Sequence, residues 1–453
     1  MLTLYDKHTI QPMGEDRLER LRRLGIVKSA RDLNPAPSQR EISNRVSVSG
    51  PRPDTTVGNM DNQPLEILLP GGRTIETEYG SCFVLDHVYP FSYEHGDFKL
   101  AGPQSLPTTV AATIFQDNRL ADYNFEDFLF LDTETTGLYG AGTIAFMVGA
   151  AFFESDHAGR QVFVVRQYFL RDHGDESAML HLLSELLAER PALVTFNGRS
   201  FDLPLLETRF MMNRLDGAVG NLLERPHIDL LPPARRLWRR RIGSCSLNSL
   251  EQNLLGLQRS REDVPGWAIP GLYMDYLRTG DARDLLRVFY HNRIDMLSMV
   301  TLTQRIVHQF SSPQPLDQPL DLLSLARWQL ALGLKTEAEQ NLRLVVDQDL
   351  PLEHYHSALQ ELALLLKRDD RREEAVLFWK QFAVSSLDDV TAHVELAKHY
   401  EWHDQDLAVA THWTEQALAL AETVQTFKAK IRREELQNRL ARLKRKIANS
   451  YEE

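Results

Sequence analysis

A short stretch near residue 130 constrains this chain more than any other: an apolar segment followed by two carboxylates and a turn. Residues 128–131 are apolar and too few for a helix, which predicts a buried strand. Asp132 and Glu134 follow, and residues two apart on an extended backbone point to the same side. Buried like charges repel, and a divalent cation, which prefers oxygen ligands, relieves that repulsion. We therefore predict a metal site at the end of this strand; the alternative is a strand end with ordinary polar turn residues.

The segments after this strand alternate between two hydrophobic periods. Strands are predicted at 128–133, 143–153, 162–170, 192–196 and 228–231, and helices at 175–189, 203–212, 246–255 and 285–307. Three strands joined by short turns, followed by alternating helices and strands, are typical of an α/β layer with a mixed sheet. We assign this domain to residues 127–312, with a small β-rich region at 64–126 packed on it.

The first 63 residues have a different composition. Residues 14–32 have leucines at helical spacing, which predicts a short amphipathic helix. Residues 33–63 contain several prolines and many polar side chains without an apolar period, so we expect a linker there.

Composition limits the class of protein. A chain of 453 residues is expected to form two or three domains, and a net charge of −12 argues against a protein that coats nucleic acid through its overall charge. The two cysteines, Cys82 and Cys245, are too few for a disulfide framework, so a reducing compartment is the simpler interpretation. Neither a signal peptide nor an apolar run of membrane-spanning length is present, and we expect a cytoplasmic protein without a membrane partner.

Residues 320–453 have helical patterns throughout, with an internal repeat. Leu-Ala pairs recur at 325–326, 362–363 and 396–397, and further alanines follow at 338, 375 and 410. The interval is close to the ~34 residues of tetratricopeptide repeats, which this region resembles although the glycine of their first helix is absent. An ordinary helical bundle is the alternative. Between 421 and 453, nine Lys or Arg face five Glu, which indicates a solvated helix face or a nucleic-acid contact.

Two further motifs carry polar groups of interest. In the first, a strand ends at Asn197 and a helix begins near Asp202; taken alone, these are a turn residue and a helix N-cap. In the second, His291 and Asp295 lie four apart in a helical pattern and so share a helix face; taken alone, they are a surface pair.

The three motifs in this order resemble the DEDD 3′–5′ exonucleases, which have a ribonuclease-H-like fold. The segments 195–204 and 291–295 resemble more closely the YprB-type predicted exonucleases, and 79–82 and 93–96 also fit that group. The resemblance covers roughly residues 65–310 and leaves the C-terminal helices as an additional domain.

This resemblance implies a metal-dependent nuclease acting on DNA or RNA. Its four metal-binding carboxylates correspond to Asp132, Glu134, Asp202 and Asp295, which we expect to converge on one site. Two Mg²⁺ or Mn²⁺ ions about 4 Å apart would bind between them for phosphodiester hydrolysis. A structure-specific endonuclease on the same site is an alternative. So is a catalytically silent scaffold that recruits protein partners through its helical repeats.

The general base is less clear from the motif. Related enzymes usually carry Tyr four residues, or His five residues, before the last Asp, whereas here His291 is four and Tyr290 five residues before Asp295. On a continuous helix a residue four before Asp295 lies about 40° from it and one five before about 140° away, which favours His291. If the helix began only at residue 292, either side chain could reach the site.

Candidate substrate contacts surround these motifs. They are Thr135, Asn197, Arg199, Arg239 and Arg240. The last two belong to a basic cluster at 235–241, which we place between a strand and the next helix. Arginines there could hold phosphates and Trp238 could stack on a base; a solvated basic loop is the alternative. We expect Asp229 to be structural or to support the ligands, and not to be a fifth metal ligand.

Overall fold

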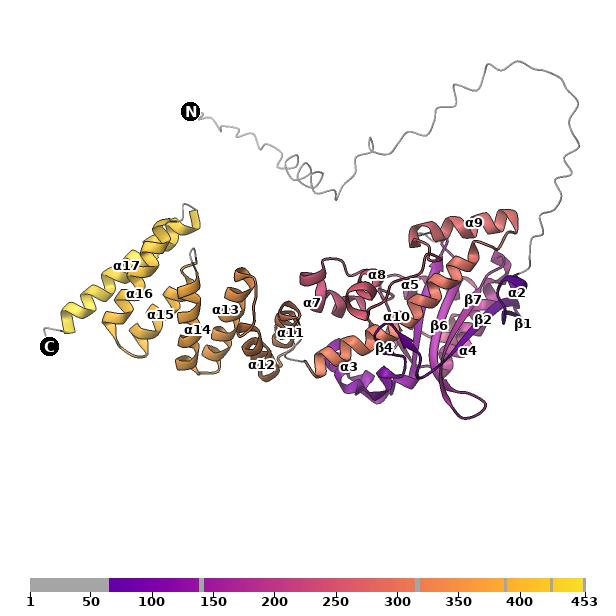
Figure 1. Ribbon diagram of the computed structural model, residues 1–453, viewed down its shortest axis with the longest axis horizontal. Helices are drawn as coiled ribbons and strands as arrows, with labels where there is room; N and C mark the ends of the chain where they lie inside the picture. The colour runs from indigo at the N-terminus through magenta and orange to yellow at the C-terminus, as the bar shows by residue number, and fades with distance from the viewer. Residues whose placement is uncertain (1–64, 138–141, 314–317, 387–388, 424–426, 451–453) are drawn as a thin grey trace, which may run out of the picture. The chain divides into compact units, whose positions relative to one another are not determined.

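The computed structural model describes residues 65–137, 142–313, 318–386, 389–423 and 427–450 (Figure 1). The predicted helix at 14–32 and the linker at 33–63 lie outside these residues. The described residues cluster as one unit. None of the described helices is long and apolar enough to cross a bilayer. Both cysteines are buried and free.

A seven-stranded mixed sheet forms the centre of the first part of the chain. Its spatial order is β1-β2-β7-β6-β5-β8-β9, in which β5, β8 and β9 run parallel and the other pairs are antiparallel. The strands are β1 (Arg73–Thr77), β2 (Gly80–Pro90), β5 (Phe128–Thr135), β6 (Ala145–Ser155), β7 (Gln161–Phe169), β8 (Ala192–Thr195) and β9 (His227–Asp229). The predicted mixed sheet is confirmed. Strands β1 and β2, from the small β-rich region, extend this same sheet through the pairing of β2 with β7.

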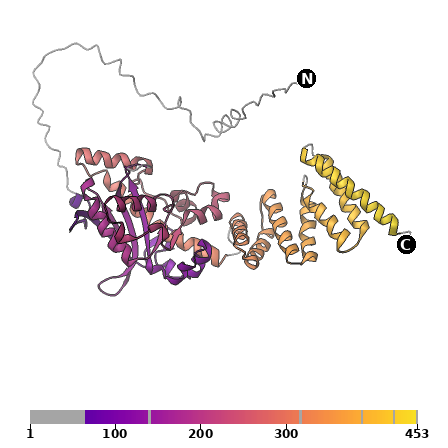
Figure 2. The same cartoon turned by 180° about the vertical axis from the view of Figure 1, so that it is seen from behind.

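Helices cover both faces of the sheet (Figures 1 and 2). Side chains of β5 alternate between the faces: Leu129 and Leu131 belong to one buried cluster, Phe128 and Phe130 to the other. The first cluster includes α4 (Glu176–Glu189), α5 (Asp202–Met212) and α9 (Ile269–Thr279). The second includes α3 (Thr108–Phe115), α7 (Leu231–Ile242) and the C-terminal part of α10 (Leu285–Ser311). Asp132 and Glu134 lie two and four residues after Phe130 on the same strand, so their side chains point to the same side as that of Phe130, towards the second cluster.

The basic cluster at 235–241 is part of a helix, so the interpretation of a loop is wrong. In α7, Ala234, Leu237 and Trp238 pack into the core, and the arginines at 235, 236, 239 and 240 are exposed. The Trp238 side chain is 0% exposed, so the predicted base stacking is also wrong. The prolines at 232 and 233 fit this helix, because proline is compatible with the first turn.

Several short elements complete this part. They are α2 (Leu65–Leu68), the hairpin of β3 (Glu94–His95) and β4 (Phe98–Lys99), α6 (Asp216–Val219), and α8 (Leu247–Leu250). The segment predicted as one helix at 246–255 has two parts: α8 is followed directly by one π-helical turn, Glu251–Leu255. Helix α10 begins at Leu285, well before residue 292, so residues 290–295 lie within a continuous helix.

Seven helices follow among the described residues after 317, and the first six form three hairpins. They are α11 (Pro319–Ala331), α12 (Lys335–Val346), α13 (Leu352–Arg368), α14 (Arg372–Ser385), α15 (Thr391–Trp402), α16 (Leu407–Thr423) and α17 (Phe427–Ser450). The repeating alanines are all buried, at positions 326, 338, 363, 375, 397 and 410. Because these side chains are small, the paired helices can approach closely there. In basic α17, Arg439, Arg442 and Lys446 all pair with Glu401 of α15, whose side chain is fully buried.

The first of these hairpins packs against the sheet domain. Arg241 of α7 pairs with Asp321 of α11 at 2.9 Å. The ring of Trp328 lies 5.1 Å from that of Phe310 at the end of α10, and the guanidinium of Arg236 lies over it. Because Leu325 and Trp328 join the second core cluster, the hydrophobic core of the sheet domain continues into α11.

Candidate active site

The predicted site lies where the parallel strands end. Asp132 and Glu134 are near the carboxyl end of β5, and Asp229 ends β9. Carboxyl ends of parallel strands meet at one edge of a sheet, so polar groups that follow them gather there. Asp229 is bound to backbone: it accepts hydrogen bonds from the N–H groups of Asn197, Arg199 and Leu231. It thus shapes the loop after β8.

Asp202 is the first residue of α5 and turns towards β5. Its Oδ1 accepts hydrogen bonds from the backbone N–H of Thr133 at 3.1 Å and from its hydroxyl at 2.5 Å. This carboxylate is therefore held against the residue between Asp132 and Glu134, and it does not act as a simple N-cap. Burial raises the pKa of Asp202 to about 6, although the Thr133 hydrogen bonds oppose the shift.

Asp132 is held from helix α10 by a residue that the sequence did not reveal as functional. The fully buried Asn292 donates from Nδ2 to Asp132 Oδ2 at 3.1 Å. Gln167 of β7 donates to Asn292 Oδ1 at 3.0 Å and so fixes the orientation of the amide. Gly149 of β6 is in register with both Asp132 and Gln167, and it leaves the space that Asn292 fills. The glycine within a strand was the one available signal.

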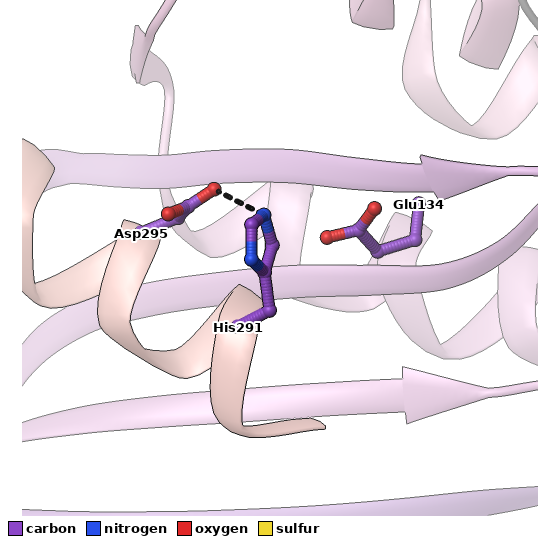
Figure 3. Close-up of side chains that lie close together, drawn as sticks. All are labelled: Glu134, His291 and Asp295. Atoms are coloured by element: carbon purple, nitrogen blue, oxygen red, sulfur yellow. Dashed lines mark ion pairs between the residues drawn. The ribbon is translucent and has the colours of Figure 1, made fainter. Parts of the chain in front are cut away.

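Glu134, His291 and Asp295 form a compact cluster between β5 and α10. One ligand atom from each lies within 4.8 Å of the other two. Figure 3 shows the imidazole of His291 between the two carboxylates, with Nε2 3.5 Å from Asp295 Oδ2. The side chains of His291 and Asp295 are 14% and 15% exposed, so this pair is not a solvated surface pair.

The four carboxylates influence one another's charge. Burial, followed by the charges of Asp202 and Asp295, raises the pKa of Asp132 well above its usual value. Burial and the charges of the other three raise the pKa of Glu134 similarly. Burial also raises the pKa of Asp295. Clustered buried carboxylates with a nearby imidazole fit a divalent cation, because its charge would remove the repulsion that favours their protonation.

Two side chains from the loop after the π-helical turn approach the same cluster, and no sequence pattern marked them. Asp263 Oδ1 lies 2.7 Å from His291 Nδ1. The buried guanidinium of Arg259 pairs with Asp295 and with Glu251. Burial by itself lowers the pKa of His291, but the hydrogen bond to Asp263 and the charge of Asp295 outweigh it, so the pKa is raised overall.

Tyr290 points away from this cluster. Its hydroxyl accepts a hydrogen bond from the backbone N–H of Ser260 at 3.2 Å, and the guanidinium of Arg293 lies over its ring. Since α10 is continuous through residues 290–295, His291 lies on the face of Asp295 and Tyr290 does not.

The candidate substrate contacts differ in their surroundings. Thr135 is buried and donates its hydroxyl to the carbonyl of Gly137, so this hydroxyl shapes the turn after β5. Asn197, in a left-handed conformation with φ of 69°, and Arg199 are exposed beside Asp202. Arg239 and Arg240 are exposed on α7, which begins two residues after the end of β9.

Known proteins are similar to this chain in sequence. A family model described as the RNase_H superfamily matches residues 129–307, from β5 to α10. The uncharacterized protein YprB of Bacillus subtilis (strain 168) is 32% identical over 383 residues, covering 83% of this chain and 88% of the relative. The matched range contains all four carboxylates and His291. The chain therefore belongs to the RNase H superfamily as an RNase H-like nuclease related to YprB.

Proposed function

We propose that this protein is a metal-dependent 3′–5′ exonuclease that hydrolyses phosphodiester bonds of DNA or RNA. The observation that carries the proposal is the arrangement of Asp132, Glu134, Asp202, Asp295 and His291 at one edge of an RNase H-like sheet. Bound at these carboxylates, two Mg²⁺ or Mn²⁺ ions would supply Lewis-acid chemistry at the scissile phosphate. The order of the motifs, which resembles that of DEDD exonucleases, supports the 3′–5′ direction.

The chain's own groups have distinct parts in this proposal. Neutral His291 that donates Nδ1–H to Asp263 leaves the lone pair of Nε2 facing Glu134 and Asp295, where it accepts the proton of the attacking water. Thr133 and Asn292 keep the carboxylates of Asp202 and Asp132 turned inwards. In this proposal Asn197 and Arg199, which are exposed and lie a few residues before Asp202 in the chain, contact the substrate strand.

The arginines of α7 are a second candidate contact for the substrate in the proposal. Arg235, Arg236, Arg239 and Arg240 are exposed together on one helix, and such a basic stripe suits a phosphate backbone. We further propose that residues 320–453 form a tetratricopeptide-like domain that recruits a protein partner. The hairpin arrangement and the buried alanines support it.

The test is nuclease activity of the full-length protein with Mn²⁺ and Mg²⁺, beside Asp132→Asn. We expect the variant to lose activity to background, because it removes a ligand charge. A matched control is Asp275→Asn, which changes an exposed carboxylate on α9 and should leave activity unchanged.

Substrate design separates the alternatives. Stepwise shortening of a 5′-labelled oligonucleotide from its 3′ end supports the proposal. Cleavage of a circular single strand would instead favour an endonuclease. Background activity of the wild-type protein on every DNA and RNA substrate would favour a catalytically silent scaffold.

A further inference from the structure

A buried arginine contacts the candidate metal site. The side chain of Arg259 is only 6% exposed, and its Nη2 donates to Oδ1 of Asp295. Its Nη1 lies 3.2 Å from His291 Nδ1 and 3.6 Å from Asp263 Oδ2. One guanidinium therefore touches both a proposed metal ligand and the proposed base with its partner carboxylate.

Arg259 is itself held by a buried carboxylate. Its Nε and Nη2 donate to the two oxygens of Glu251, each at 2.6 Å, and the Glu251 side chain is 0% exposed. Glu251 Oε1 also accepts a hydrogen bond from Ser298 of α10, and His95 Nε2 lies 2.8 Å from that hydroxyl. This planar two-bond pair fixes the guanidinium in direction as well as in position.

The β3–β4 hairpin fixes the turn that carries Glu251. The N–H of Asp97 donates to the carbonyl of Leu255 at 2.8 Å. Gly96, with φ of 62°, lies so close that a Cβ there would be 1.9 Å from this carbonyl oxygen. A Cβ on Gly256 would be 2.4 Å from the carboxylate of Asp97. The segment at 93–96 that resembles YprB-type exonucleases thus packs against the π-helical turn. Single π-helical turns are frequent at functional sites.

We propose that Arg259 is a positioning residue of the metal site, which fixes Asp295 by one carboxylate oxygen and leaves the other available to a divalent cation. The inference rests on the proposed function, since it concerns the same ligands. Arg259 binds Oδ1, and Oδ2 is the oxygen that faces His291. Glu251 and the hairpin prevent the guanidinium from following Asp295, so the carboxylate has one orientation before a cation arrives.

A second buried pair in the chain provides a matched control. Arg209 of α5 binds both oxygens of Glu176, each at 2.6 Å, and both side chains are 8% exposed. Both pairs have the same chemistry and both are buried, but the Arg209 pair joins α5 to the start of α4, whereas the Arg259 pair contacts Asp295.

The experiment is Mn²⁺ binding to the full-length protein without nucleic acid, measured by electron paramagnetic resonance. Replacing both members of a pair, as in Arg259→Gln with Glu251→Gln, removes one positive and one negative charge, so the field at the site changes little. We expect this double variant to bind Mn²⁺ ~10–100-fold more weakly, the usual effect of losing a group that orients a ligand. Arg209→Gln with Glu176→Gln should bind as the wild type does.

The outcomes separate the two proposals. If the wild type does not bind Mn²⁺, the metal site of the proposed function fails, and the role of Arg259 fails with it. If the wild type binds Mn²⁺ and the folded Arg259 double variant binds it equally well, only the role of Arg259 is overturned. Should the double variant not fold, Arg259→Lys replaces it. A single ammonium cannot hold Glu251 and Asp295 with the same fork, so weaker Mn²⁺ binding supports the inference and unchanged binding overturns it.

Discussion

At the scale of single residues, the site is built from acids whose orientation is fixed by neighbouring donors. Thr133 holds Asp202, Asn292 holds Asp132, and Arg259 holds Asp295. In each case the donor is neutral or is itself neutralised by another carboxylate, so the cluster keeps its negative charge. This explains why burial and mutual repulsion raise the carboxyl pKa values, and why a divalent cation is the fitting occupant.

The assignment of His291 as the base leads to a test by mutation and pH. We expect His291→Ala to lower the rate by ~10²–10⁴, the usual contribution of a general base, and Tyr290→Phe to have little effect. The base must be neutral, so activity falls as the pH drops through its pKa. Because the pKa of His291 is raised, this acidic limb should lie above about pH 6.5 and vanish in His291→Ala. A large loss of rate in Tyr290→Phe, together with a wild-type rate in His291→Ala, would assign the base to Tyr290 instead.

The raised pKa of Asp202 predicts how the metal-free protein responds to acid. Its folded-state pKa of about 6 exceeds its unfolded value of 3.8, so the folded state binds the proton more tightly. Stability from this group is present below pH 3.8 and is lost as the pH rises through 6; one pKa unit corresponds to roughly 1.4 kcal/mol. In EDTA, the melting temperature of Asp202→Asn should therefore fall less between pH 5 and 7.5 than that of the wild type. Equal pH dependence in both proteins would contradict this.

At the scale of elements, the site depends on the register of three neighbouring strands under one helix. Asp132, Gly149 and Gln167 lie side by side on β5, β6 and β7, and Asn292 of α10 bridges the first and the third. Because Gly149 lacks a side chain, the helix approaches closely enough for this amide to reach the strand. The sheet and the helix thus orient Asp132 together.

Gly149→Ala tests this packing. An added Cβ would lie 2.4 Å from Oδ1 of the fully buried Asn292, so the amide must shift and its bond to Asp132 weakens. We expect a loss of ~1–3 kcal/mol in urea unfolding, typical of overpacking, together with reduced nuclease activity. Gly271→Ala on α9 is the control: its Cβ meets nothing within 4 Å, and alanine in a helix should leave stability equal or higher. Wild-type activity and stability in Gly149→Ala would show that Asn292 has room to adjust.

At the scale of the whole molecule, α11 connects the sheet domain to the helical hairpins through buried contacts. Trp328 packs on Phe310 and under Arg236, and Arg241 pairs with Asp321. We propose that the helices from 320 onwards nevertheless form a separable domain, because each hairpin builds its core with its neighbours.

Limited proteolysis and calorimetry test this division. Cleavage within 308–322 should give a stable C-terminal fragment. Trp328→Ala should cost ~3–5 kcal/mol at the junction, the range for a buried aromatic residue, and should separate the unfolding of the helical part into its own calorimetric transition. Leu377→Ala, at an exposed position on α14, is the control and should keep the wild-type profile. Resistance throughout 308–322 without a stable fragment would count against a separate domain.

The sequence by itself determined the sheet, most helices and the main acids, because these depend on local patterns. Apolar segments of strand length, carboxylates directly after a strand, and His291 four residues before Asp295 are properties of neighbouring residues. The interpretation of 235–241 as a loop was wrong, because the burial of Trp238, which makes one face of this helix apolar, depends on tertiary packing. Tertiary structure alone decided the residues that orient the site. Gln167, Asn292 and the segment that carries Glu251, Arg259 and Asp263 lie far apart in the chain, and their polar groups meet only because the sheet register, the β3–β4 hairpin and α10 bring them together away from water.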